Sequence, residues 1–577
     1  MSTRPARSRP HTSTEPPAAA ASAVWWWSAA AVAAAALTFL PAWRNGFVWD
    51  DPLVLEQVRA IHGIRDLIVP PELIPRFYYR PLIFLTYLVD HTLGGDQPFW
   101  YHVSVVATHT LNTALLCWLT ARLVGTRPTA MIGALLFAVH PIHVESVAWV
   151  AGRSDVVAAT CMLLSAALFT YDRPRWAAWC GVGTYALALL AKEVAIAGVL
   201  LLPLLDLVRG RTPRWPLTTA LSATTLAYVV MRHAALGSAL TGTLSTAPIV
   251  VTMLGAVGFY VSKLLLPIGL SAYVPEIPDG ALLPVLGLVT LTVAVAVAAV
   301  STQRGDRITP WCIAWFLATL APSFAVIVWQ MAQTPVADRY LYVPSIAVSL
   351  LVSRVVTSLQ SRPRQRVHAA LVAVAGLLAV ASVLRNRVWA DDLVFWQDVT
   401  AKAPAYAFGH RELAQMYLRR NQLDEAEAAL NRALGAKSDA EGRVMTLNNL
   451  GNLYLRRQQL DQAEQMFRQG LDVHEHEYLH NGLGRLAMKR AELAQARGDS
   501  AEALRQVHLA QAQLERCVAI APNEPKAHAL LGQVLYTLND REGARQHLQR
   551  ALDLGAEGGV AEISRQYLKQ LPAASPR

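Results

Sequence analysis

Two adjacent carboxylates follow the first long apolar run of the chain. They are Asp50 and Asp51, within the stretch FVWDDP. Two neighbouring carboxylates repel each other, which raises the proton affinity of one of them, and a carboxylate within hydrogen-bond reach can take the proton of a hydroxyl group. The same residues could begin a helix, because Asp is a favoured N-cap residue and Pro52 suits the first helical turn. Local spacing leaves both interpretations open, and they are compatible.

Further ionisable residues stand at the ends of apolar runs, where a charge near the hydrocarbon is costly unless it is solvated or paired. They are Arg80 in FYYRPL, His140, His143 and Glu145 in HPIHVES, Arg153 and Asp155 in GRSD, Lys192 and Glu193 in AKE, and Asp338 and Arg339 in VADRYLYVPS. An arginine beside a carboxylate indicates either a structural ion pair or a guanidinium that binds a phosphate. Lys192 and Glu193 could also neutralise each other.

The histidines favour hydrogen bonding over metal binding. HPIHVE offers two imidazoles and a carboxylate, but this spacing matches no established zinc motif. We interpret His140 and His143 as hydrogen-bonding groups at a helix break around Pro141, with a divalent metal as the alternative. His102 and His109 lie two helical turns apart and are interpreted as partnered histidines inside a bundle. We expect no required cofactor, and nothing resembles a Walker lysine, a phosphate-binding glycine loop or a G-x-S-x-G motif.

The elements that must position these residues are membrane helices. The 577-residue chain is 54% hydrophobic and 16% charged, and its apolar runs reach the ~17 to 25 residues that cross a bilayer. The pattern predicts an all-α membrane bundle with about eleven spans, at 24–41, 101–121, 128–141, 155–171, 176–190, 194–208, 215–231, 282–300, 310–328, 340–356 and 367–384. We treat the run 247–267 as an interfacial or re-entrant helix.

The arginine-rich connections determine the expected orientation. With the N-terminus inside and 247–267 not crossing, every short basic connection falls on the cytoplasmic side. The same topology brings Asp50, Asp51 and the other ionisable residues near the span ends to the outer face. Because the net charge of +10 is explained by these connections, we expect no nucleic-acid partner.

The composition changes near residue 385, after which helical repeats replace the apolar runs. Leu413, Ala414, Tyr417, Ala426, Leu430 and Ala433 recur in the same spacing as Leu450, Gly451, Tyr454, Ala463, Phe467 and Gly470. This is the packing pattern of tetratricopeptide repeats, of which we count about four. The predicted domains are a disordered cytoplasmic N-terminus (1–23), a multi-span membrane domain (24–384), a linker (385–404) and a repeat domain (405–570).

This combination resembles the transmembrane and tetratricopeptide-repeat O-mannosyltransferases, a branch of the C-type glycosyltransferase fold. The stretches that carry the resemblance are FVWDDP, YYRPLIFLTYLVDHTLGGDQPFWYHVSVVATHTLN, LLFAVHPIHVESVAWVAGRSDVVAA, LLAKE, KLLLPIGLSAY and VADRYLYVPS. The resemblance implies a membrane enzyme that transfers a sugar from a polyprenyl phosphate to a Ser or Thr hydroxyl of a protein, with inversion at the anomeric carbon. The sugar that the family resemblance implies is mannose.

Carried onto this chain, the resemblance implies a role for each candidate residue. Asp50 and Asp51 would hold the catalytic base, and Arg153 and Arg339 would bind the donor phosphate. The pocket would be supported by Arg80, His140, His143, Glu145, Asp155, Lys192, Glu193 and Asp338. The partners would be the lipid-linked donor, membrane lipids and a protein held by the repeats.

Two features look bacterial rather than eukaryotic. The basic, Ala- and Arg-rich N-terminus and the short repeat array are typical of a bacterial protein. We therefore expect a bacterial inner-membrane protein with its repeats in the periplasm, and leave open the sugar, the carrier and whether the acceptor is protein or glycan. The alternative function is a non-catalytic scaffold that anchors the repeats to the membrane. A transporter is disfavoured because the polar groups gather on one face.

Overall fold

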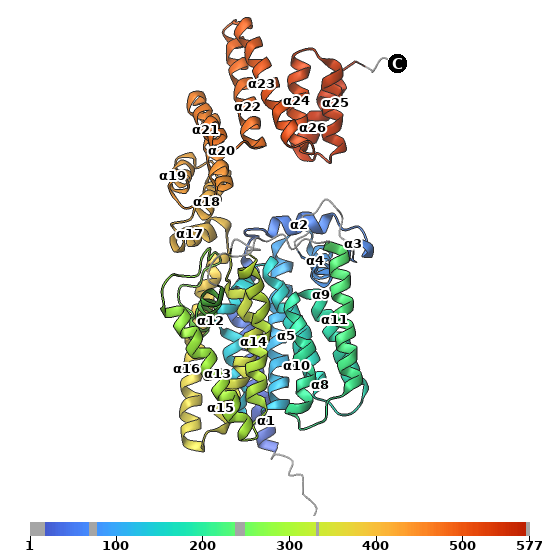
Figure 1. Cartoon of the computed structure of the whole chain (residues 1–577), viewed down its shortest axis with the longest axis vertical. Coiled ribbons are helices and arrows are strands. Elements are labelled where there is room, and N and C mark those ends of the chain that lie inside the picture. Colours follow the sequence, from blue (N-terminus) through green and yellow to red (C-terminus); the bar gives the residue numbers. More distant parts are fainter. Residues whose placement is uncertain (1–17, 69–77, 237–248, 330–333, 573–577) are drawn as a thin grey trace, which may run out of the picture. The chain divides into compact units, whose positions relative to one another are not determined.

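The computed structural model describes residues 18–68, 78–236, 249–329 and 334–572. These residues are helical and contain no β-strand, which confirms the all-α class. The chain divides into two compact units, Met1–Asp398 and Val399–Arg577. Figure 1 shows the helix bundle of the first unit and the helix pairs of the second.

The first unit is built of long and short helices, and the last of them, α17, crosses into the second unit. In order they are α1 (Ala18–Phe39), η1 (Leu40–Arg44), α2 (Asp51–Arg59), α3 (Ile64–Ile68), α4 (Pro81–Gly94), α5 (Pro98–Leu123), η2 (Pro128–Met131), α6 (Ile132–Val139), η3 (Pro141–His143), α7 (Val144–Ala148), η4 (Ala151–Arg153), α8 (Ser154–Phe169), α9 (Trp176–Ala191), η5 (Glu193–Ala197), α10 (Gly198–Val208), α11 (Trp215–Leu236), α12 (Ile249–Leu265), α13 (Leu282–Gln303), α14 (Ile308–Val328), η6 (Asp338–Leu341), α15 (Tyr342–Ser358), α16 (Ser361–Asn386), η7 (Arg387–Trp389) and α17 (Asp392–Lys402).

Among the described residues, seven helices are long and apolar enough to cross a membrane. They are Val24–Arg44, Pro98–Leu123, Ala151–Phe169, Leu282–Gln303, Ile308–Val328, Asp338–Ser358 and Ser361–Trp389. Pro128–Val139 and Pro141–Ala148, bent by 44°, would make eight if together they form one span. The other expected spans are helical but do not meet this criterion, and correspond to α9, η5 with α10, and α11. The chain is a multi-pass membrane protein.

Some expected boundaries can be compared with the helices directly. Residues 1–17 of the expected N-terminal segment lie outside the described residues, and α1 begins at Ala18. The expected linker 385–404 contains the end of α16, then η7 and α17, so the chain is helical over most of it.

Close packing of α6 on α15 and a helix break at Pro141 position His143 and Glu145. A Cβ at Gly133 of α6 would lie 1.9 Å from the carbonyl oxygen of Ser349 in α15, so only glycine permits this approach. Pro141 has no backbone N–H to continue the helix. The break after α6 turns the chain so that His143 and Glu145 face the interior, where both are buried.

The second unit is a stack of four helix pairs and one final helix. The pairs are α18 (Ala407–Arg419) with α19 (Leu423–Gly435), α20 (Ala440–Arg456) with α21 (Leu460–Val473), α22 (Glu477–Ala496) with α23 (Ser500–Ile520), and α24 (Pro525–Thr537) with α25 (Arg541–Asp553), followed by α26 (Gly558–Gln570). A Cβ at Gly451 would lie 2.4 Å from the Phe467 ring. This close approach confirms the packing role of the repeated small residues.

Candidate active site

The two carboxylates at the start of α2 have different surroundings. Asp51 is completely buried and accepts two backbone hydrogen bonds, from Val48 N at 3.0 Å and from Ala151 N at 2.9 Å. Both of its oxygens are therefore used to hold the loop before α2 against η4. Burial raises the pKa of Asp51 well above its usual value, although the two backbone donors act in the opposite direction.

Asp50 keeps part of its surface accessible. It occupies the N-cap position of α2, but its side chain makes no capping hydrogen bond. Its Oδ1 instead accepts a hydrogen bond of 3.1 Å from the indole of Trp149. Burial raises the pKa of Asp50 to about 6, while the charge of Arg339 and the hydrogen bonds to the carboxylate lower it. Of the two residues, Asp50 is the one whose carboxylate a substrate can reach.

The loop before Asp50 is anchored by the segment that follows α16. Trp49 N donates to Asp392 Oδ1 at 2.8 Å, and Gly46 N donates to the carbonyl oxygen of Ala390 at 2.9 Å. Trp49 has a φ of 59°, a left-handed conformation that is unusual for a bulky residue. Its ring stacks on Trp149, with centroids 5.0 Å apart. These contacts hold the strained residue in place and so determine where Asp50 stands.

Three cations lie near one another, each paired with a carboxylate from another segment. Arg339 pairs with Glu145, which also accepts the backbone N–H of Arg339 at 3.0 Å. The other two pairs are Lys192 with Asp155 at 2.5 Å and Arg80 with Glu193 at 3.0 Å. Lys192 and Glu193 therefore do not neutralise each other, contrary to the alternative considered from the sequence, because each has a different partner.

Arg80 and Arg339 act on Lys192, and Arg339 alone of the three cations acts on Asp50. Burial lowers the pKa of Lys192, the charges of Arg80 and Arg339 lower it further, and Asp155 opposes them. Arg339 also lowers the pKa of Asp50, so this arginine connects the carboxylate to the cation group. The side chains of Arg80, Lys192 and Arg339 are 16%, 10% and 14% exposed, so each keeps a small accessible face.

Arg153 is in a different environment. It is 1% exposed and pairs with Asp90 of α4 rather than with its sequence neighbour Asp155. Its Nη2 donates to the carbonyl oxygen of Tyr101 at 3.0 Å, and its guanidinium lies 4.3 Å from the Tyr87 ring centroid. With its terminal nitrogens occupied inside the protein, Arg153 supports the region around Asp51 and is less accessible than Arg339.

The four histidines singled out from the sequence have partners inside the bundle. His140 Nε2 lies 3.0 Å from the carbonyl oxygen of Leu264, and His143 lies 2.8 Å from that of Phe137 and 3.0 Å from Ser345 Oγ. His109 lies 2.7 Å from the hydroxyl of Tyr342, and His102 lies 3.3 Å from the carbonyl oxygen of Gly46. The interpretation of these side chains as hydrogen-bonding groups is confirmed.

Asp338 begins η6, is 4% exposed and directly precedes Arg339. Within the described part of the chain, no three His, Cys, Asp or Glu side chains are arranged to hold a metal ion.

Sequence reasoning missed several residues that shape this site. Trp149 donates a hydrogen bond to Asp50, and the Trp49 ring stacks on the Trp149 ring. Asp90 pairs with Arg153, and Asp392 anchors the loop before Asp50. Asp90 was recognisable as an ionisable residue inside an apolar run, the same signal that identified Arg153. The aromatic residues carry no such signal, because tryptophan near a span end is also the usual interfacial anchor.

Family comparisons agree with the repeat array in the second unit. A model described as "Tetratricopeptide repeat" matches residues 409–476, and a second with the same description matches residues 484–508 and 525–550.

Curated relatives carry the name of the family that the sequence resembles. Human "Protein O-mannosyl-transferase TMTC1" is 43% identical over 96 residues, covering 16% of this chain and 11% of the relative. "Protein O-mannosyl-transferase Tmtc2" of Drosophila melanogaster is 34% identical over 144 residues, covering 23% and 15%. The resemblance to O-mannosyltransferases is confirmed. The chain spans 11% and 15% of the length of these two O-mannosyltransferases.

Two solved structures are also similar. ArnT from Cupriavidus metallidurans, bound to undecaprenyl phosphate, is 17% identical, with 77% of this chain and 80% of ArnT covered and a TM-score of 0.39. PilF of Pseudomonas aeruginosa is 16% identical, with 34% of this chain and 84% of PilF covered and a TM-score of 0.24.

Proposed function

We propose that this protein is a membrane glycosyltransferase that moves a sugar from a polyprenyl-phosphate carrier to a Ser or Thr hydroxyl of a protein. The names of the relatives support mannose as the sugar. The observation that carries the proposal is the partly exposed Asp50 carboxylate, with a raised pKa, beside the paired but accessible Arg339. A base and a phosphate ligand are the two groups that this transfer needs.

Asp50 acts as the general base in this proposal. Its carboxylate takes the proton of the acceptor hydroxyl as the oxygen attacks the anomeric carbon, and the bond from that carbon to the carrier phosphate breaks. Attack opposite the leaving phosphate inverts the anomeric carbon. Asp51 positions the base, because its two oxygens tie the loop to the backbone at Val48 and Ala151.

Arg339, Lys192 and Arg80 stabilise the charge on the departing phosphate. The positive groups are already fixed by Glu145, Asp155 and Glu193, so little reorganisation is needed as charge grows. Arg339 is the first choice because its charge also acts on Asp50. Arg153 contributes by holding Asp90 and the Tyr101 carbonyl in the layer beneath.

The proposal assigns the transferase to residues 24–384 and the capture of a protein acceptor to the repeats at 405–570. Stacked repeats commonly bind extended peptides on their concave face. The proposed location is a bacterial inner membrane, with Asp50 and the repeats outside the cytoplasm. The basic connections between the apolar runs support that orientation.

The test compares three substitutions on one short segment. Purified protein in detergent is assayed with polyprenyl-phosphate mannose and a Ser/Thr peptide. Asp50→Asn should lower kcat by about 10² to 10⁴, the usual contribution of a general base, with an unchanged Tm. Glu56→Gln is the matched control, because it removes the same charge from an exposed position of α2, and it should retain wild-type activity.

Asp51→Asn separates positioning from catalysis. An amide can accept only one of the two backbone hydrogen bonds without turning a donor towards the other, so Tm and kcat should fall together. Normal transfer by Asp50→Asn would contradict the assignment of the base. Transfer by none of the proteins, including wild type, would favour the membrane-anchored scaffold.

A further inference from the structure

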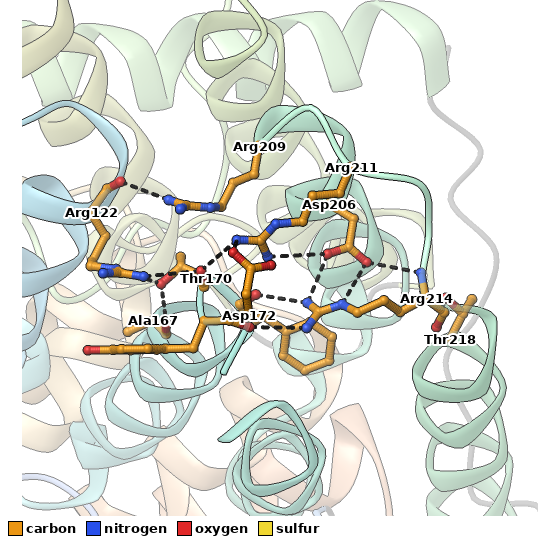
Figure 2. A network of polar contacts seen from close by, with 11 residues as sticks. Arg122, Ala167, Thr170, Asp172, Asp206, Arg209, Arg211, Arg214 and Thr218 are labelled. Carbon is orange, nitrogen blue, oxygen red and sulfur yellow. Dashed lines mark hydrogen bonds and ion pairs between the residues drawn. The ribbon is translucent and has the colours of Figure 1, made fainter. Parts of the chain in front are cut away.

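A group of arginines lies at the end of the bundle away from Asp50. Four of them, Arg122 at the end of α5 and Arg209, Arg211 and Arg214 after α10, surround the end of α8 (Figure 2). We call these four residues the arginine cluster. Helix α5 runs from the active-site end, where Tyr101 contacts Arg153, to the arginine cluster at Arg122. Because a helix rises ~1.5 Å per residue, the two ends are about 30 Å apart.

Three members of the arginine cluster bind the end of α8. Arg214 donates to the carbonyl oxygens of Phe169 at 2.8 Å and Tyr171 at 3.3 Å. Arg211 and Arg122 both donate to the carbonyl oxygen of Thr170, at 3.1 and 3.2 Å. These carbonyls have no partners within the helix, so the arginines satisfy them and lie where the negative end of the helix dipole favours cations.

The charges of the cluster are not balanced. The labelled carboxylates beside the four arginines in Figure 2 are Asp172, which pairs with Arg211 at 2.6 Å, and Asp206, which pairs with Arg214 at 2.8 Å. Two positive charges therefore have no carboxylate of their own within the network. Helix carbonyls are dipoles and do not neutralise a guanidinium.

Arg209 carries most of this excess. Its Nη1 donates to the carbonyl oxygen of Arg122 at 3.2 Å, but its Nε is buried without a hydrogen-bond partner. Within the described ranges it forms no ion pair. Burial and the charges of Arg211 and Arg122 lower the pKa of Arg209, and the charge of Asp172 opposes them only in part. A guanidinium crowded by two others is a site for an external anion with several oxygens.

Tryptophans mark this end as the level of the membrane surface. Trp176 begins α9 and Trp215 begins α11, next to the arginine cluster, and their side chains are 63% and 70% exposed. Exposed tryptophans at span ends are typical of the headgroup region of a bilayer. Arg307 also lies here and donates to the carbonyl oxygen of Leu207 in α10 at 2.8 Å. An anion at this depth is carried by a lipid.

We propose that the arginine cluster binds the phosphate headgroup of an anionic phospholipid in the leaflet at this end of the bundle, with Arg209 as the main ligand. The lipid supplies the negative charge that the network lacks. It also fastens the ends of α5, α8 and α10, which carry no active-site residue at this level. The proposal is independent of the transferase function.

The test measures lipid retention by native mass spectrometry. The full-length protein is reconstituted with equal amounts of phosphatidylglycerol and phosphatidylcholine, then washed in detergent. Wild-type protein should retain phosphatidylglycerol selectively, and Arg209→Gln should reduce that retention about fivefold, the effect of one arginine at a charged lipid surface. Arg173→Gln is the matched control, since it removes an exposed arginine beside the cluster, and should retain wild-type binding.

A second variant at Arg209 and a competition with inorganic phosphate complete the test. Arg209→Lys keeps the charge and should retain more phosphatidylglycerol than Arg209→Gln, which remains informative if the latter folds poorly. Inorganic phosphate should neither raise the Tm nor displace the lipid, and doing either would identify a soluble anion instead. Equal losses in Arg209→Gln and Arg173→Gln, or no lipid selectivity in wild-type protein, would overturn the proposal.

Discussion

The two ends of the helix bundle handle charge in opposite ways. Around Asp50, the cations Arg80, Lys192 and Arg339 each bind a carboxylate from another segment. Around the end of α8, the arginines bind mainly backbone carbonyls and outnumber the carboxylates.

Under the two proposals, this difference suits each end of the bundle to a different task. Side-chain ion pairs fix charged groups in a defined geometry, which favours catalysis of a reaction that moves charge. Carbonyl contacts leave net positive charge at the surface, which favours binding of an anionic lipid. Three substitutions test this comparison.

The largest effect is expected where a buried ion pair is broken. Arg153→Met should lower the free energy of unfolding by about 3 to 5 kcal/mol, because Asp90 stays buried without its partner; their side chains are only 2% and 3% exposed. Thermal unfolding in detergent would measure it. The double variant Arg153→Met/Asp90→Leu should recover most of the loss. A wild-type Tm for Arg153→Met alone would contradict the view that this pair supports the site.

A smaller effect is expected in the pH dependence of transfer. The base must be ionised, and the pKa of Asp50 is about 6 because burial raises it. Below that pH, kcat/KM should fall tenfold per unit. Removing the charge of Arg339, which lowers this pKa, should move the acidic limb to higher pH in Arg339→Gln, whatever the change in the maximal rate.

Arg59→Gln is the matched control for this pH profile. Arg59 lies in α2, the helix that follows Asp50, but its side chain is exposed and pairs with Asp96. Its loss should leave the acidic limb in place. A wild-type limb near the ordinary carboxyl pKa of about 4 would mean that burial of Asp50 does not govern the reaction.

The smallest effect is expected at the opposite end. Arg354 pairs with Asp306 at 3.3 Å, with side chains 33% and 19% exposed. Asp306 keeps its hydrogen bonds to Ile308 N and Thr309, so Arg354→Gln should cost less than ~1 kcal/mol. The same unfolding measurement applies. A loss as large as that of Arg153→Met would remove the distinction between the two ends.

Much of the fold follows from the sequence because its signals are local. Long apolar runs predict membrane helices, and the spacing of small and large residues predicts the repeats, which Gly451 against Phe467 confirms. The bend at Pro141 and the partnered histidines were also predictable. The number of spans was less so, since α9 and α10 are apolar but short.

The pairing of charges could not be predicted in this way. At Lys192 the backbone is extended, with φ −161° and ψ 146°, so the side chains of Lys192 and Glu193 point in different directions. Each then meets a partner far along the chain, Asp155 or Arg80. Arg153 likewise pairs with Asp90, a residue far from it in sequence that only the fold brings close.

The sequence by itself determined which groups are present, the helices that carry them and the clustering of candidate residues at span ends, because composition and periodicity report on burial residue by residue. Only the tertiary structure distinguished the surroundings of Asp50 from those of Asp51: Trp149 donates to Asp50, whereas the backbone of Ala151 and Val48 donates to Asp51. The physical reason is that accessibility, partners and pKa depend on segments brought together by packing, and local sequence does not encode those distances.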